Sequence, residues 1–325
     1  MSGRQGLSGA SGRVRGTAQR YAEQLEPTAV GRFWSRLLEV EFVDRAVALA
    51  AKLLVCIFPL LVLVAAISPD ATRQAILDTM VSRFGLSGAA LDVVRLSFES
   101  PEETRTATGV VGAIVTLAFA VSFTTALQRT YLRAWRRPPG GGIHNKRRGA
   151  VWVGGVLALF GTLALLNTVL HGPVASVTSW VLGTVLSVGL WWWTAHLMLR
   201  GEVRWRPLLP TGVATGLGAW IYTLASTIWF PANVTKNYAQ FGAFGLSLAF
   251  VTWFTGLAFI IVGAAVLGPA LVQGHDRLAR WLNPTGDYLT PGSAPPLPGP
   301  VRPMRLTDAF GRGAGGSGTS WPGQN

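Results

Sequence analysis

The chain has 325 residues, of which 50% are hydrophobic and only 13% are charged, and its formal net charge is +13. Soluble domains usually contain about 25% charged residues, so this composition excludes an ordinary soluble protein and favours a membrane protein. A single cysteine, Cys56, excludes an internal disulfide bond and a cysteine-based metal site.

The first 45 residues are mostly polar and include seven arginines. A secretory signal peptide would place its short apolar region much earlier, so we expect no cleaved leader. Residues 1–30 lack the apolar content needed to pack, and we predict that they form a disordered cytoplasmic N-terminus.

Six long apolar stretches follow within a predicted membrane domain, residues 31–282. No stretch contains Asp or Glu, and Lys52 is the only formally charged residue in any of them. Each stretch is near or above the ~20 residues that cross the hydrocarbon core as a helix. Backbone groups must be paired in lipid and no strand-like alternation is present, so the stretches are predicted to be helical. The predicted fold is an all-α, polytopic membrane protein with six transmembrane helices at 46–67, 108–127, 150–170, 177–199, 208–230 and 243–267.

The first stretch contains two residues that are unusual in an apolar helix, Lys52 and Pro59. Lys52 lies six residues, or roughly 9 Å, from the start of the stretch, so its side chain can reach back to the cytoplasmic interface. Alternatively, it faces the bundle interior and meets a lipid phosphate, an anionic substrate, a backbone carbonyl or water. Pro59 removes one intrahelical hydrogen bond, so we predict a kink near the middle of this helix.

The segment 68–107 is the only long loop on the predicted outer side. Apolar residues recur in it at three- and four-residue spacing, and GLSG at 85–88 separates two such runs. We therefore predict two short amphipathic helices that lie on the outer leaflet or cap the bundle. The residues that set this spacing are Ile76, Met80, Phe84, Leu91, Val94 and Phe98.

Basic residues predict how the chain threads the membrane. With the N-terminus inside, the inner segments hold 22 Lys and Arg residues and the outer segments hold 5. Positive residues are retained on the cytoplasmic side, so both termini are predicted to be cytoplasmic. Of the 28 basic residues, 25 are Arg, a bias that with the high Ala and Gly content suggests a GC-rich bacterial genome. We therefore expect a multi-pass protein of the bacterial plasma (inner) membrane.

The inner loop 128–149 carries seven basic residues and no acidic residue. Such a loop lies against anionic headgroups, where each cation contributes roughly 1 kcal/mol of attraction. Anionic membrane lipids are therefore the expected partners, and Lys52, Arg129 and Arg133 are the candidate contacts for a lipid or substrate. Because threading explains the basic charge, no nucleic-acid partner is expected.

Pro210, Gly212 and Gly216 lie in the fifth stretch. Pro210 is near the predicted helix start, where proline is tolerated. Gly212 and Gly216 form a GxxxG pattern, which lets another helix approach closely, either within the bundle or in a homo-oligomer. With Pro59, these residues are the candidates for helix kinks and packing.

No enzymatic chemistry is predicted. The four histidines, His144, His171, His196 and His275, are too scattered for a metal-binding pair, and neither a GxSxG elbow nor a P-loop is present. The apolar stretches also lack the carboxylates that proton relays commonly use. We therefore expect a non-enzymatic protein without a metal or cofactor.

The C-terminal segment, residues 283–325, is rich in proline and glycine. It lacks the apolar content to pack, and we predict a disordered cytoplasmic tail.

Several short motifs occur in a consistent order across roughly residues 30–275. They are FPLL at 58–61, ALQRTYLRAW at 126–135, Leu209-Pro210, FGAFG at 241–245, Trp253 and Gly263-Ala264. In order and spacing the chain resembles the BrkB/YihY inner-membrane proteins, historically labelled ribonuclease BN-like. That family often has Gly-Ala-Glu near the end of its sixth helix, whereas Ala265 occupies the last of these positions here.

The resemblance implies a six-helix plasma-membrane protein, and envelope-related and lipid-translocation roles have been suggested for the family. It also adds Gly242 and Gly263 to the candidate packing residues. The leading hypothesis is a protein that binds or translocates an anionic lipid or amphiphile. The alternative is an envelope-associated scaffold without transport. A ribonuclease is the least favoured reading, because the sequence contains no nuclease motif.

Overall fold

The computed structural model describes residues 29–67, 102–139, 143–169, 173–274 and 276–293. Within these ranges the chain is helical apart from turns, short connections and one isolated bridge between Val203 and Leu289. The all-α prediction is therefore confirmed for the described part of the chain. The helices are α2 (Ala29–Glu39), α3 (Phe42–Ile67), α6 (Glu102–Ala134), α7 (Ile143–Val169), α8 (Pro173–Met198), α9 (Trp205–Phe241), α10 (Ala243–Val272) and α11 (Arg277–Leu282).

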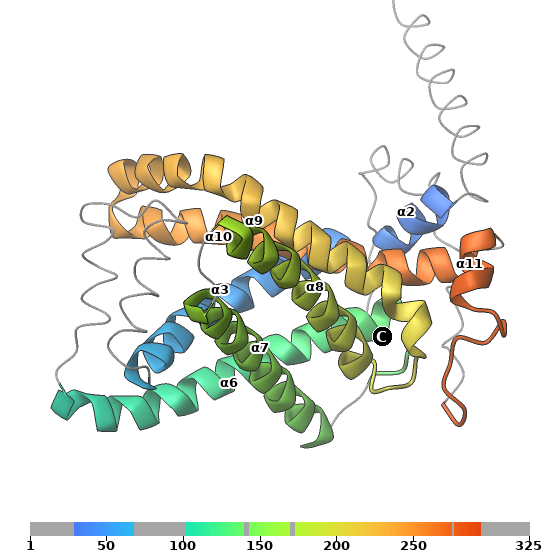
Figure 1. Ribbon diagram of the computed structural model, residues 1–325, viewed down its shortest axis with the longest axis horizontal. Coiled ribbons are helices and arrows are strands. Elements are labelled where there is room, and N and C mark those ends of the chain that lie inside the picture. The colour runs from blue at the N-terminus through green and yellow to red at the C-terminus, as the bar shows by residue number, and fades with distance from the viewer. Residues whose placement is uncertain (1–28, 68–101, 140–142, 170–172, 275, 294–325) are drawn as a thin grey trace, which may run out of the picture.

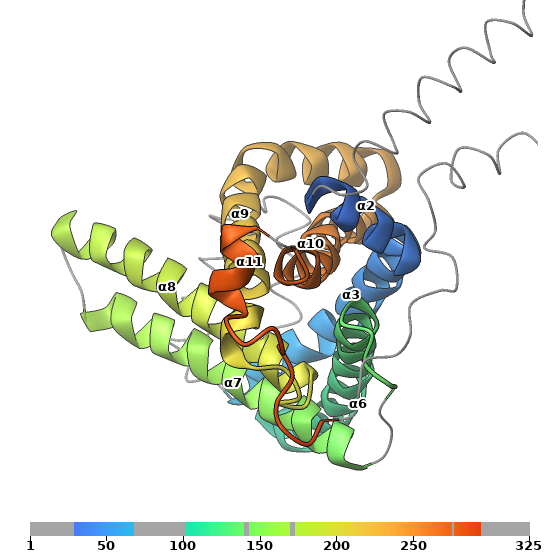
Figure 2. The same cartoon turned by 90° about the vertical axis from the view of Figure 1, so that its right-hand side faces the viewer.

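Helix α10 is the centre of the bundle. It contacts α2, α3, α6, α9 and α11, and Figure 2 shows it end-on among these neighbours. Its buried face includes Ala258, Ala265 and Ile261, and small side chains on this face let neighbouring helices approach closely. Helix α8 packs on α9, and α7 packs on both α6 and α8, so that α7 and α8 extend to one side of the bundle (Figure 2).

Helices α9 and α10 form a long hairpin along one side of the molecule (Figure 1). Helix α9 has 37 residues, or about 55 Å at 1.5 Å per residue. Residues 231–242 form one of the predicted outer segments, and residues 231–241 continue helix α9 instead of forming a loop. Polar residues lower the hydropathy of this segment, but Phe230 and Val234 still pack against Leu246 of α10. Gly242 makes the turn with a φ of 60°, which favours glycine.

The six predicted membrane stretches each lie largely within a long helix. Among the described residues, three helices are long and apolar enough to cross a membrane, namely α8 over 181–198, α9, and α10 over 244–272. A six-span topology stays a prediction, as does a kink at Pro59 within α3. The predicted amphipathic helices of the outer loop fall mostly on residues 68–101, outside the described residues. The same holds for 1–28 and 294–325, where disorder was predicted.

Residues 283–293 form a strap across the end of the bundle at which α9 begins. The amide of Arg204 donates to the carbonyl of Tyr288 at 3.0 Å. Leu289 is buried and forms the isolated bridge with Val203. The predicted start of disorder at residue 283 is therefore too early. Backbone pairing and one buried leucine hold this segment, although its proline- and glycine-rich sequence shows no helix or strand pattern.

The close contact between α8 and α9 is testable at Gly212. A Cβ there would lie 2.6 Å from Trp192 Cβ and 2.7 Å from its Cα, whereas a Cβ at Gly189 of α8 would meet nothing within 4 Å. We expect Gly212→Ala to lower the free energy of unfolding by roughly 1–3 kcal/mol through overpacking. The control Gly189→Ala should be neutral or slightly stabilising. Thermal unfolding in detergent measures both, and equal stability of the two variants would contradict the packing.

Candidate functional site

Two contacts define a seam between helices α3 and α6. At one end, Arg133 near the end of α6 pairs with Glu41, which directly precedes α3, at 3.3 Å. Further along, Lys52 Nζ of α3 donates to Ser122 Oγ of α6 at 2.9 Å. Residue numbers rise along α3 as they fall along α6, so the two helices run antiparallel. We call this contact the α3–α6 seam.

The ammonium group of Lys52 has a neutral partner. No carboxylate in the described ranges forms an ion pair with it, and its hydrogen bond goes to the Ser122 hydroxyl. Lys52 and Ser122 are both half-buried. Ser122 was not identified from the sequence, because only the register of two helices reveals which hydroxyl lies opposite a given lysine.

The same register brings further basic residues to one end of the seam. Arg45 lies seven residues before Lys52, and Arg129 lies seven residues after Ser122. Seven residues are nearly two helical turns, or about 10 Å. Arg45 and Arg129 therefore face each other across the seam at about that distance from the Lys52 hydrogen bond.

Three arginines and one carboxylate gather at this end of the seam, which we call the mouth of the seam (Arg45, Arg129, Arg133 and Glu41). Glu41 lies 3.6 Å from Arg45 and 3.3 Å from Arg133. Arg129 is exposed and forms no ion pair with any residue that the structure describes. Burial lowers the pKa of Arg45, and the charges of Arg133 and Arg129 lower it further, while Glu41 opposes them. The mouth therefore carries a surplus of positive charge.

Other arginines at this end of the bundle are held by carboxylates. Arg136 donates to both oxygens of Glu39, at 3.0 and 2.8 Å. Arg137 has a fully buried side chain and donates to Glu202 at 2.7 Å, and Arg200 also pairs with Glu202. Charge-assisted bonds of this kind fix the connection between α6 and the α8–α9 turn. These arginines stabilise the fold by joining segments that lie far apart in the sequence.

Arg36 of α2 connects three helices. It is 6% exposed, and it donates to the carbonyl of Ala134 at 3.0 Å and to the side chain of Gln273. Burial lowers its pKa to about 10, and the nearby Arg136 contributes in the same direction. Arg36 therefore stays charged at neutral pH and ties α2 to α6 and α10. The polar N-terminal sequence gave no sign of this role.

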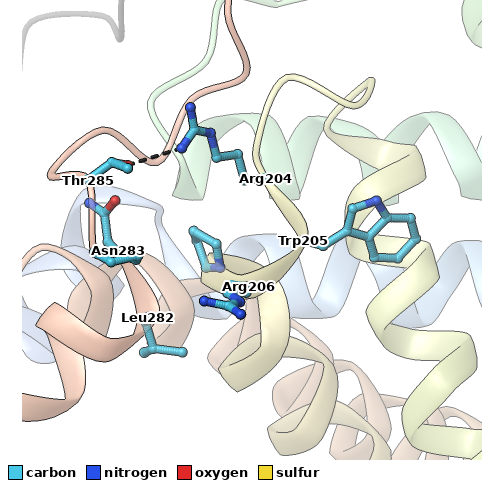
Figure 3. A pocket seen from close by; sticks show the side chains of 8 residues that line it. Arg204, Trp205, Arg206, Leu282, Asn283 and Thr285 are labelled. Carbon is cyan, nitrogen blue, oxygen red and sulfur yellow. Dashed lines mark hydrogen bonds between the residues drawn. The ribbon is translucent and has the colours of Figure 1, made fainter.

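A pocket of about 240 Å³ lies between the start of α9 and the strap (Figure 3). Arg204 extends across its rim and donates to Thr285 at 3.0 Å. Arg206 and Leu282 also line it, and Trp205 points away toward α8. The pocket brings together two arginines, Arg204 and Arg206, whereas the mouth of the seam brings together three, so the pocket is a weaker candidate for an anion.

The other predicted site residues lie on α9 and α10. A Cβ at Gly212 or Gly216 would meet backbone atoms of α8, whereas a Cβ at Gly263 would lie 3.7 Å from a ring carbon of Phe42. Pro210 is not at the helix start as predicted, because α9 begins three residues before the predicted 208 and Pro210 lies inside it. These positions shape helix packing and lie away from the seam contacts.

Several side chains that could bind a metal instead pair with arginines or stack on an aromatic ring in the described part of the chain. There, no three His, Cys, Asp or Glu side chains gather as a metal site requires. Glu39, Glu41 and Glu202 pair with arginines, and the His196 ring stacks on Trp205 with centroids 4.0 Å apart.

One protein family, described as Virulence factor BrkB, matches residues 33–280. The chain belongs to this family. The resemblance inferred from the ordered motifs is thereby confirmed, and the match runs from α2 into α11 and includes the whole seam. Family membership and the long apolar helices together identify a BrkB-family membrane protein. No curated protein and no solved structure matches the chain.

The Lys52–Ser122 bond can be tested by a double-mutant cycle. Ser122→Ala removes the acceptor of a half-buried ammonium, so we expect a loss of about 1–3 kcal/mol in the free energy of unfolding. In a Lys52→Met background the same substitution should cost clearly less, because no ammonium needs the hydroxyl. Thr125→Ala is the control, since within the described part of the chain that hydroxyl donates to the carbonyl of Val121 on its own helix and to no other helix. Additive effects of Ser122→Ala and Lys52→Met, measured by unfolding in detergent, would exclude the contact.

The ion pairs of Arg137 and Arg32 should contribute unequally to the free energy of unfolding, because one is buried and the other is exposed. Glu202→Ala removes the carboxylate from buried Arg137, but Glu202 is itself 23% exposed. We therefore expect a loss of about 2–3 kcal/mol, below the ~3–5 kcal/mol of a fully buried pair. Asp276→Ala breaks an exposed pair with Arg32 and should cost less than about 1 kcal/mol. Similar unfolding midpoints for the two variants would show that the Glu202 contacts do not support the fold.

Proposed function

We propose that this BrkB-family protein binds an anionic lipid or amphiphile along the α3–α6 seam and moves it between membrane leaflets. The single observation that carries the proposal is the hydrogen bond from Lys52 to Ser122. A hydroxyl does not neutralise the ammonium, so its charge remains available to an anion within an apolar helix. Intramembrane charges of this kind commonly mark substrate pathways.

The proposed setting is the bacterial inner membrane, with six membrane-spanning helices and both termini in the cytoplasm. The excess of Lys and Arg in the predicted inner segments, 22 against 5, supports this orientation. In this orientation the mouth of the seam lies at the cytoplasmic leaflet, where anionic lipids gather against basic residues.

The seam offers two positively charged positions at which an anionic headgroup could bind. The mouth is the first, and Lys52 is the second, about 10 Å further along the helices. Electrostatic attraction grows as the surroundings become less polar, so a single ammonium can compensate part of the hydration that an anion loses there. The proposal includes no catalytic step, since the sequence contains none of the hydrolase or nucleotide-binding motifs considered above.

A scaffold function is the second candidate, and exposed aromatic side chains favour it. Trp34 of α2 is 49% exposed and Trp281 of α11 is 59% exposed, and both helices lie at the same end of the bundle (Figure 1). Such residues are also common in protein interfaces. A stable partner recovered from membranes, and lost when the basic residues of 129–148 are neutralised, would favour this function over transport.

The transport proposal is tested with the full-length protein in liposomes. Fluorescent phosphatidylglycerol and, in a parallel assay, fluorescent phosphatidic acid are chemically quenched from outside, and the rate at which inner-leaflet lipid becomes quenched is measured. We expect Lys52→Met to slow this rate by about tenfold or more, since an unpaired charge crossing hydrocarbon costs several kcal/mol. Lys236→Met, at an exposed position near the end of α9, is the matched control and should not change the rate. Equal rates for wild type, both variants and empty liposomes would rule out lipid movement.

A further inference from the structure

The chemistry of the mouth is more specific than a general attraction to anions. Its three guanidinium groups come from two helices, Arg45 from α3 and Arg129 and Arg133 from α6. Glu41 is the carboxylate that pairs with two of them. A surplus of about two positive charges therefore remains. Arginine presents several donors in a planar fork, which suits an anion that has several acceptor oxygens.

The neighbouring charges leave this surplus in place. Arg136 and Glu39 form a doubly hydrogen-bonded pair that is neutral overall. Asp44 precedes Arg45 on α3, but it is exposed and forms no ion pair with the described arginines. Arg129 and Arg133 are exposed like Asp44 and are screened by water and salt in the same way, so the partly buried Arg45 carries the least screened charge of the mouth.

The surface beyond the mouth suits an acyl chain. Val55 lies three residues after Lys52 and is 46% exposed, and Phe119 lies three residues before Ser122 and is 36% exposed. The antiparallel register carries both side chains away from the arginines, on the far side of the Lys52–Ser122 contact. Along one seam, a cationic end is thus followed by a polar contact and then by exposed apolar side chains.

These observations select among anionic headgroups. A carboxylate has two oxygens and one negative charge, and so does the phosphodiester of phosphatidylglycerol if only its non-bridging oxygens are counted. A terminal phosphate monoester has three acceptor oxygens and a charge of about −1.5 to −2 near neutral pH. The monoester matches both the number of guanidinium groups and the surplus charge.

We infer that the mouth of the α3–α6 seam, formed by Arg45, Arg129 and Arg133, is a binding site for the terminal phosphate monoester of a lipid. This inference rests on the proposed function, for which it names the headgroup class and the residues that first receive it. Glu41 competes with the phosphate for Arg45 and Arg133. Binding therefore exchanges two carboxylate contacts for contacts to the phosphate, without a change in the covalent structure of the lipid.

The test measures binding of fluorescent phosphatidic acid to the full-length protein in detergent. Phosphatidylglycerol with the same acyl chains and inorganic phosphate serve as competitors. We expect phosphatidic acid to bind at least about fivefold more tightly than phosphatidylglycerol, as the additional charge implies. Inorganic phosphate should compete only at far higher concentration, because it lacks an acyl chain. If phosphatidylglycerol binds as tightly, the monoester assignment is wrong; if inorganic phosphate competes as well as the lipid does, the site is not a lipid site.

Substitutions at the mouth make the test specific. Arg129→Gln should weaken phosphatidic acid binding by roughly fivefold, and Arg129→Lys should retain part of it because the charge remains. Arg280→Gln, which removes an exposed arginine of α11, is the matched control and should bind as wild type does. Glu41→Gln should bind more tightly than wild type, a gain that misfolding does not produce. Unchanged binding in both Arg129→Gln and Glu41→Gln would overturn the site.

The outcomes of the two experiments separate the two proposals. If binding depends on Arg129 and Glu41 but no lipid moves in liposomes, the phosphate site stands and the transport function fails. If lipid moves in a Lys52-dependent way but binding ignores Arg129 and Glu41, transport stands and this site is refuted.

Discussion

The hydrogen bond from Lys52 to Ser122 fits one register of helices α3 and α6. A cation taken out of water loses much of its hydration, so it must find a polar partner within reach of its side chain. Ser122 is that partner, at 2.9 Å. In the register that places Ser122 opposite Lys52, the ends of the two helices also come together, and Arg133 meets Glu41.

The arginines at this end of the bundle divide into two groups by the balance of charge around them. Arg36, Arg136 and Arg137 are bonded to carbonyl, amide or carboxylate oxygens within the chain, and they connect α2, α6, α10 and the α8–α9 turn. Arg45 and Arg129 belong to the mouth, where positive charge exceeds negative charge. Because the first group holds the helix ends in place, the second group keeps its position although its charges repel one another.

Hydropathy predicted the helices well because a long apolar run has few alternatives to a helix in lipid. Hydropathy did not predict where a helix ends when its packing continues beyond the apolar run. Helix α9 extends through residues 231–241 because Val234 still packs on α10. The strap was taken for a disordered tail, since its order depends on backbone pairing with Arg204 and on burial of Leu289 rather than on any local pattern.

The sequence by itself determined the membrane class, the family, the helical content and the position of Lys52 as the one charge in an apolar stretch that contains no acidic residue. These properties follow from composition and local order, which do not depend on which helices become neighbours. Only the tertiary structure decided that Ser122 accepts a hydrogen bond from Lys52 and that Arg45 lies near Arg129 at the mouth. It also decided that Arg36 and Arg137 bind other parts of the chain and stabilise the fold. Each of these facts depends on the register between segments that lie far apart in the chain, and no single-helix pattern encodes that register.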